Sequence, residues 1–293
     1  MLPSTQATKF GSKPPKTHHL AVFGGMIAAI LRHKIHSKHK SEIMADDTGM
    51  ILALDSVFAQ CSVALVDTAG QTLAEQTLAG NRAQTQQILP LVDDVLRSQG
   101  VQVADMTAIA FNRGPGAFSG IRINTAVAQA LAFAHDVPCV PVSSLQALAQ
   151  TAWQACGLAQ AYAVLDARMQ QVYLGAFALD AATGLMQPVI ETLTAEASAS
   201  SALEPNAERL ADYGSQTPQA WALVKDGALL SPHDNQPIIT IDAPSAAVIG
   251  RLAAAQWTIG GGVPAQAALP VYLRHHAWKT LAEQQADKAK RNA

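Results

Sequence analysis

Charged and aromatic side chains are scarce in this chain of 293 residues. Only 14% of the residues are Asp, Glu, Lys or Arg and 5% are Phe, Trp or Tyr, whereas 49% are apolar. This composition argues against disorder over most of the length, because disordered chains are rich in charge and poor in apolar residues. The length leaves room for one large domain or two smaller ones, with ample core.

Cysteine is equally rare. Cys61, Cys139 and Cys156 lie far apart among apolar neighbours, and no CxxC pair occurs. An odd number of isolated cysteines predicts reduced, buried thiols in a cytoplasmic protein, and none of them is expected to be a catalytic nucleophile.

The sequence also lacks the pattern of a metal site. From residue 44 onward there are four histidines, His135, His233, His275 and His276, and only the last two are neighbours. A metal site requires several His, Cys, Asp or Glu ligands that converge. No metal is therefore expected, and a metalloprotease mechanism has no support.

Positive charge is missing from most of the chain. Residues 1–43 carry seven Lys or Arg and one acid, a balance of +6, whereas residues 44–293 carry 13 Lys or Arg and 21 Asp or Glu, a balance of −8. Proteins that bind nucleic acid by themselves usually display a basic stripe. The acidic body is thus a poor candidate for independent nucleic-acid binding.

No apolar run is long enough to span a bilayer. The longest near the N-terminus, LAVFGGMIAAIL at 20–31, has twelve residues, and a membrane span needs roughly twenty. A secretory signal would need a small-x-small cleavage site after this run, which ends in RHKIHSKHK instead. Residues 1–47 are interpreted as a basic extension, disordered or non-native, with Met44 as an alternative start; a membrane-surface helix is the remaining alternative.

The folded pattern begins at Met50. Three runs rich in β-formers, MILALDSV, CSVALVD and QTLAEQTL, are separated by residues compatible with turns. The elements expected after them are a helix at 85–98, a strand at 107–112, a helix at 119–135, a strand at 139–142 and a helix from Ser143, capped by Ser143 or Ser144.

The second half repeats this order. AYAVLDAR at 161–168 places Asp166 after an apolar run, as MILALD places Asp55, and VYLGAFALD and a third run at 188–193 follow. Two βββαβα units predict an α/β, ribonuclease-H-like fold with two duplicated lobes, as in actin, sugar kinases and heat-shock ATPases. The alternative is that an apolar run followed by Asp arises by chance. The lobes are expected at 48–155 and 156–274, with a helix at 275–290 packing back on the first.

The stretch RGPGAFSGIRI resembles a phosphate-binding loop without satisfying either common motif. A Walker A loop requires a lysine, and none occurs between 113 and 135. The dinucleotide pattern GxGxxG fits Gly114 and Gly116, but Ser119 occupies its third position. Two interpretations stay open: an anion site at a helix N-terminus, or glycines that permit a sharp turn, with Ser119 capping the helix. The anion candidates are Arg113, Gly114, Gly116, Ser119, Gly120 and Arg122.

The helix expected at 119–135 is apolar on most of its faces. Five alanines alternate with Ile121, Ile123, Val127 and Leu131. Such a pattern predicts a helix that is buried all round. Its small residues would allow close approach of another helix, either from this chain or from a partner.

Five segments together resemble the TsaB (YeaZ) family. They are ILALDSVFAQCSVAL, FNRGPGAFSGIRINTAVAQALAF, VPVSSLQALAQ, VLDARMQQVYLGAF and LPVYLRHHAWK, in this order over residues 50 to about 280. The resemblance does not extend to residues 1–43. It implies a paralogue of TsaD, the subunit that transfers a threonylcarbamoyl group to N6 of adenosine 37 in tRNA.

The resemblance implies a non-catalytic subunit. TsaB proteins bind TsaD through helices of the N-terminal lobe and act with the ATPase TsaE, so a heterodimer with TsaD is expected, a homodimer when the chain is alone, and contact with tRNA only through the complex. No cofactor is expected to bind this chain tightly; ATP, if bound, belongs at the interface of the complex. The predicted interface residues are Gln84, Gln87, Ile88, Leu91, Phe118, Ile121, Asn124, Val127, Ala128 and Leu131.

The rival hypothesis is an enzyme of the same fold, either glycoprotease-like or ATP-dependent. In active kinases of this fold the aspartate after the first strand helps to hold metal and phosphate. Here the expected partners are missing, so Asp55 and Asp166 are interpreted as turn-forming residues or relics of a nucleotide site. Arg168, in the family-like motif LDARM, either has a structural role or lines the cleft between the lobes.

Overall fold

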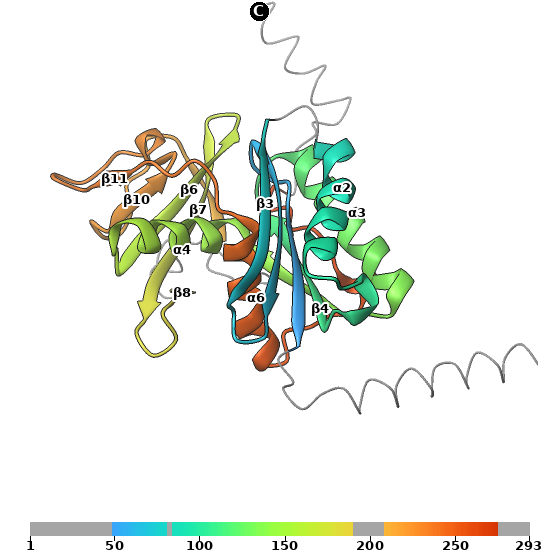
Figure 1. Ribbon diagram of the computed structural model, residues 1–293. Helices are drawn as coiled ribbons and strands as arrows, with labels where there is room; N and C mark the ends of the chain where they lie inside the picture. The colour runs from blue at the N-terminus through green and yellow to red at the C-terminus, as the bar shows by residue number, and fades with distance from the viewer. Residues whose placement is uncertain (1–48, 81–83, 190–207, 275–293) are drawn as a thin grey trace, which may run out of the picture. The chain divides into compact units, whose positions relative to one another are not determined.

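The computed structural model describes residues 49–80, 84–189 and 208–274 (Figure 1). The predicted extension at 1–47 and the predicted helix at 275–290 lie outside these residues. The described residues belong to one compact unit. No helix within the described ranges is long and apolar enough to cross a bilayer.

The first sheet has five strands in the order β3-β2-β1-β4-β5. The first three strands pair antiparallel, and β4 and β5 run parallel to β1. Their bounds are β1 Met50–Asp55, β2 Gln60–Asp67, β3 Thr72–Ala79, β4 Ala108–Gly114 and β5 Cys139–Ser143. Both faces of β1 are buried, since Leu52 and Leu54 enter one core cluster while Ile51 and Ala53 enter another. A central strand covered on both faces reads as a continuous apolar run, as this one does.

The second sheet repeats this topology. Its path is β11-β10-β6-β7-β8, in which β6, β7 and β8 are antiparallel and β10 and β11 are parallel to β6. A further strand, β9, also pairs with β7. The bounds are β6 Gln160–Arg168, β7 Gln171–Asp180, β8 Leu185–Pro188, β9 Glu208–Asp212, β10 Ala222–Lys225 and β11 Ile238–Ile239.

The duplication is therefore real, and the fold is ribonuclease-H-like in two lobes, as predicted. In each sheet a central strand, β1 or β6, is flanked by an antiparallel pair of strands on one side and a parallel pair on the other. The third strand of the second lobe begins earlier than the predicted run at 188–193. It spans Leu185–Pro188, and residues 190–193 lie outside the described part of the chain.

Two helices pack across the predicted boundary between residues 155 and 156, on the sheet of the other half. Figure 1 shows α2, Gln84–Ser98, and α3, Phe118–His135, on one face of the first sheet, and α6, Ala246–Thr258, on the opposite face. The remaining helix of the first half, α4 at Ser144–Cys156, packs mainly on the second sheet. Thus the boundary separates the sheets, but α4 and α6 each cover the sheet of the other half.

Helix α3 differs from the prediction in two respects. Only one side of it is buried, and Phe133 on the opposite side is 71% exposed. The residue before the helix is Ala117, which makes no side-chain capping bond, so Ser119 is not the cap. Ser143 does cap α4, since its hydroxyl accepts the main-chain N–H of Gln146 at 3.1 Å. The buried residues of α3 are Gly120, Ile121, Asn124, Thr125, Ala128 and Ala132.

Two of the three cysteines are buried as predicted. Burial raises the pKa of Cys139 to about 11, and burial together with the Asp55 charge raises that of Cys61 to about 11. Both thiols therefore stay protonated near neutral pH. The prediction is wrong for Cys156, which is exposed because it is the last residue of α4.

The placement of α6 can be tested at Gly250. A β-carbon there would lie 2.7 Å and 2.8 Å from the two methyl groups of Val66 on β2, and 3.2 Å from the β-carbon of Ala53. Gly→Ala within a helix normally stabilises by roughly 0.5–1 kcal/mol. Here we expect Gly250→Ala to destabilise by about 1–3 kcal/mol, because the core has no room for the extra methyl.

The measurement is urea-induced unfolding of the full chain. In a Val66→Ala background, Gly250→Ala should become neutral or stabilising, because the two positions compete for one space. Additive effects of the two substitutions would show that α6 does not pack on β2 in this manner.

Candidate functional site

The turns after the two central strands begin with the same hydrogen bond. Asp55 closes β1 and Asp166 lies near the end of β6, and each begins a six-residue segment, DSVFAQ or DARMQQ. The Asp55 side chain accepts the main-chain N–H of Val57 at 2.8 Å. In the same way, the Asp166 side chain accepts that of Arg168 at 2.7 Å. Both aspartates therefore form the short side-chain-to-backbone turn typical of Asp, and the duplication extends to the candidate site.

Asp55 is sealed inside the protein. Its side chain is 0% exposed, and its second carboxyl oxygen accepts the Asn112 side-chain amide at 3.2 Å. The amide oxygen of Asn112 in turn accepts the Gly114 main-chain N–H at 3.0 Å and the Ser144 hydroxyl at 2.6 Å. Burial raises the pKa of Asp55 to about 7, although the hydrogen bonds from Val57 and Asn112 act in the opposite direction.

The glycine loop packs directly on the turn that contains Asp55. A β-carbon at Gly120 would overlap the carbonyl oxygen of Ser56, and one at Gly116 would overlap a methyl group of Val57. The Ser56 hydroxyl also donates to the Gly120 carbonyl at 3.1 Å. The two glycines thus permit the N-terminus of α3 to lie against the β1–β2 turn, which supports the structural interpretation of this loop.

The two arginines of the predicted anion site contact different parts of the chain. Arg113 is 8% exposed and forms an ion pair with Glu208 on β9 at 3.2 Å, and the Ser143 hydroxyl also donates to Glu208. Arg122 lies on the Phe118 ring, with its guanidinium carbon 3.7 Å from the ring centre. The structure therefore does not gather the six predicted residues into one anion site.

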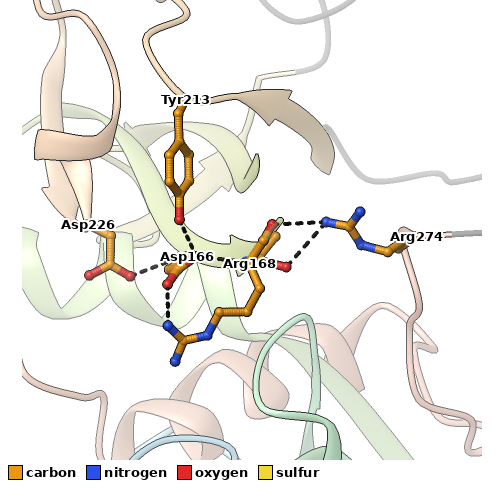
Figure 2. A network of polar contacts seen from close by, with 6 residues as sticks. Asp166, Arg168, Tyr213, Asp226 and Arg274 are labelled. Atoms are coloured by element: carbon orange, nitrogen blue, oxygen red, sulfur yellow. Dashed lines mark hydrogen bonds and ion pairs between the residues drawn. The ribbon is translucent and has the colours of Figure 1, made fainter. Parts of the chain in front are cut away.

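The turn at Asp166 is open to solvent and rich in polar contacts (Figure 2). The carboxyl of Asp166 pairs with the Arg168 guanidinium at 2.8 Å and accepts the Tyr213 hydroxyl at 2.7 Å, and its main-chain N–H donates to Asp226 at 2.8 Å. Partial burial alone would raise the pKa of Asp166. The Tyr213 hydroxyl, the Arg168 main-chain N–H and the Arg168 charge outweigh that effect and lower it.

The backbone of this second turn is strained. Three consecutive residues without glycine, Arg168, Met169 and Gln170, have φ values of 62°, 54° and 59°. Arg274 steadies the turn by donating to the carbonyls of Arg168 and of the residue before it, both at 3.2 Å. The side chain of Arg168 is 86% exposed. It therefore pairs with Asp166 at the surface, while its main chain is part of the turn.

Four residues of these networks were not anticipated from the sequence: Glu208, Tyr213, Asp226 and Arg274. They come from β9, from the segment after it, from the end of β10 and from the segment after η3, Ala265–Ala267. Arg274 belongs to the family-like segment LPVYLRHHAWK, whereas the other three belong to no motif. For Asp226 the available signal was the duplication, which makes the end of β10 equivalent to the end of β4, where Asn112 lies.

Half of the predicted interface residues are not at the surface. Ile88, Leu91, Ile121, Asn124 and Ala128 are buried between their helices and the first sheet. The apolar side chains among them pack in this chain's own core, and the Asn124 side chain donates to the carbonyls of two strands. These residues therefore hold the helices to the first sheet.

The other predicted interface residues differ in exposure. Gln87, Val127 and Leu131 are half-buried, Phe118 is 54% exposed, and the side chain of Gln84 lies outside the described part of the structure. The outward stripe of α3 consists of Ser119, Arg122, Ala126, Ala130 and Phe133.

No cluster of three or more His, Cys, Asp or Glu side chains within the described ranges is placed to share a metal ion. Asp55 and Asp166 lie in separate sheets and each is bonded to its own turn.

The buried carboxyl of Asp55 should make the stability of the protein depend on pH. The folded state favours the neutral form of Asp55, so its contribution to stability is full below the ordinary pKa of 3.8, declines as pH rises, and is lost above about 7. Relative to Asp55→Asn, the full chain should lose stability between pH 5 and 7 by up to about 1.4 kcal/mol per pH unit. Urea unfolding of both proteins across this range measures the difference; parallel curves would show that Asp55 does not titrate there.

Comparison with known proteins agrees with this geometry. The family model described as TsaD, tRNA N6-adenosine threonylcarbamoyltransferase, matches residues 71–279. The TsaB protein of Escherichia coli (strain K12) is 33% identical over 232 residues, which cover 79% of this chain and 97% of that protein. Haemophilus influenzae TsaB is 40% identical over 123 residues, 42% of this chain and 51% of that protein.

A solved structure, described as YeaZ from Pseudomonas aeruginosa, is 34% identical and superimposes with a TM-score of 0.64. It matches 77% of this chain and 100% of its own length. With its duplicated ribonuclease-H-like lobes and these relatives, the chain belongs to the TsaB (YeaZ) family of tRNA threonylcarbamoyladenosine biosynthesis proteins.

Proposed function

We propose that this chain is a non-catalytic subunit that pairs with a TsaD-type threonylcarbamoyltransferase and supports its activity on tRNA. The observation that carries the proposal is the outward stripe of α3. Ala126 and Ala130 are exposed on it, and Phe133 beyond them is 71% exposed. Small and apolar residues such as these, on the outward side of a helix, allow another helix to pack closely.

Helix α2 extends this apolar surface. It lies beside α3 on the same face of the first sheet (Figure 1), and Leu89 on it is 51% exposed. A partner with the same fold would present two equivalent helices, and the four helices would bury roughly 1,600 Å², the usual size of a specific complex. The same surface would let the free chain form a symmetric homodimer that the partner displaces.

The polar groups of the first lobe support a non-catalytic role. Asp55 is fully buried and bonded to Val57 and Asn112, and Arg113 is paired with Glu208. An ATP-dependent enzyme of this fold would need such groups free to meet phosphate or metal. We therefore assign no tightly bound cofactor to this chain and place ATP, if it binds, at the interface with the partner.

The proposed pairing with TsaD also determines how TsaE and tRNA would contact this chain. TsaE is proposed to join the TsaB–TsaD pair rather than this chain alone. Contact with tRNA is proposed to go through the complex, because residues 44–293 carry a balance of −8.

The interface is tested by Ala130→Lys on the outward stripe of α3. A lysine would place a charged, bulky group between two closely packed helices, so affinity for TsaD from the same genome should fall at least tenfold, about 1.4 kcal/mol. Ala155→Lys is the matched control, since Ala155 is also an exposed helical alanine near a helix end, on α4. Isothermal titration calorimetry with the full chain measures both.

Two results would count against the proposal. Equal affinity of Ala130→Lys and the unchanged chain would remove α3 from the interface. Hydrolysis of ATP by the isolated chain, lost on Asp55→Ala, would make the ATP-dependent enzyme the better hypothesis.

A further inference from the structure

An arginine on α3 lies on one aromatic ring and is hydrogen-bonded to a second. The Arg122 guanidinium lies 3.7 Å from the centre of the Phe118 ring and 6.0 Å from that of Tyr272, and its Nε–H donates to the Tyr272 hydroxyl at 3.1 Å. The two rings are 6.0 Å apart. Phe118 is 54% exposed and Tyr272 is 41% exposed, so both rings are open to solvent.

The chain holds Tyr272 in this place by contacts on both sides. The Gln129 side chain donates to the Ala268 carbonyl at 2.9 Å, and the Val271 main-chain N–H donates to the Arg113 carbonyl at 2.9 Å. Arg274 then donates to carbonyls of the β6–β7 turn. The segment 268–274 is therefore tied to α3, to β4 and to the second sheet.

This arrangement leaves the outer edge of the guanidinium free. Only the Nε–H of Arg122 has a partner, and Arg122 forms no ion pair with any residue in the described ranges. An arginine normally loses much side-chain entropy when it binds, but this one is already immobilised. Its two terminal nitrogens present the planar fork that matches a carboxylate.

The surroundings indicate what kind of carboxylate would bind. Leu269, close in sequence to Tyr272, is 61% exposed, and the apolar stripe of α3 continues from Arg122 through Ala126 to Ala130. An arginine flanked by exposed aromatic and aliphatic side chains is typical of the strongest contacts in protein interfaces. The net negative charge of residues 44–293 disfavours a nucleic acid phosphate at the same position.

We propose that Arg122, which lies on the Phe118 ring and donates to the Tyr272 hydroxyl, is an anchor that binds an Asp or Glu side chain of the protein docked on α3. This proposal rests on the proposed function, because the partner is the TsaD-type subunit. The anchor would give that surface a specific charged contact. The packing of α3 would supply contact area, and the Arg122–carboxylate pair would fix the register of the partner.

The test compares Arg122→Met with Arg122→Lys in the full chain, titrated with TsaD from the same genome. Methionine keeps the contact with Phe118 but removes the charge and the fork, and lysine keeps the charge without the fork. We expect both to weaken binding, methionine by about tenfold or more. Raising the salt concentration from ~50 to ~500 mM should lower the affinity of the unchanged chain for TsaD more than that of Arg122→Met.

Arg251→Met is the matched control. Arg251 lies over the Trp153 ring, 6.0 Å from its centre, but belongs to α6 on the opposite face of the first sheet. Its replacement should leave the affinity unchanged.

A charge-reversal experiment identifies the partner's residue. Arg122→Glu should abolish binding, and one Asp→Arg or Glu→Arg change among the acidic residues on the docking helices of TsaD should restore it. Rescue by one such change and by no other supports the anchor.

The outcomes separate the two proposals. If the unchanged chain does not bind TsaD, the proposed function fails. If it binds and Arg122→Met binds equally well, with the same salt dependence, the surface is correct but the anchor is refuted. If tRNA, and not TsaD, loses affinity in Arg122→Met, the ligand is a phosphate and the carboxylate proposal is overturned.

Discussion

The close approach of α3 to the β1–β2 turn is the constraint on which the first lobe depends. At Gly120 the helix is so near to Ser56 that no side chain would fit, and at Gly116 the loop is equally near to Val57. This contact closes the first lobe above Asp55 and fixes where α3 begins. The outward stripe of α3 is in turn placed by the same contact, since the inner side of the helix is fixed on β1 and β4. A glycine loop of this kind serves helix placement.

The two halves of the chain show what this contact changes. The side chains of Asp55 and Asp166 accept the same hydrogen bond from the main chain two residues on. Where α3 covers the turn, the carboxyl is buried and its pKa is raised. At the second turn, which no helix of the described residues covers, the carboxyl is paired with Arg168 and its pKa is lowered. One local motif thus yields a buried neutral acid in one lobe and a surface ion pair in the other, and the difference comes from tertiary packing.

The same distinction explains how much could be predicted from the sequence. The strands and helices as far as β7 and the duplication were predictable, because apolar runs and helical spacing are local patterns. No strand or helix was predicted between residues 194 and 274, where β9, β10, β11 and α6 lie. The burial of Ile88 and Ala128 and the packing of α6 on the first sheet depend on contacts between distant segments. The three left-handed residues after Ala167 carry no glycine or asparagine that would announce them. The role of Glu208 was equally unpredictable, because its ion pair with Arg113 forms only when β9 places the two residues side by side.

The ties between the lobes bear on whether such a protein acts by closing around a ligand. Enzymes that enclose a substrate between two lobes need a hinge whose residues absorb large backbone changes. Here a buried ion pair joins β4 to β9, and the segment 268–274 bonds to α3, to β4 and to the β6–β7 turn. Opening the lobes would expose Arg113 and Glu208 as separated charges, which is costly for groups 9% and 2% exposed. A chain tied in this way is better suited to present a fixed surface than to move, which is the property that a scaffold requires of its docking helix.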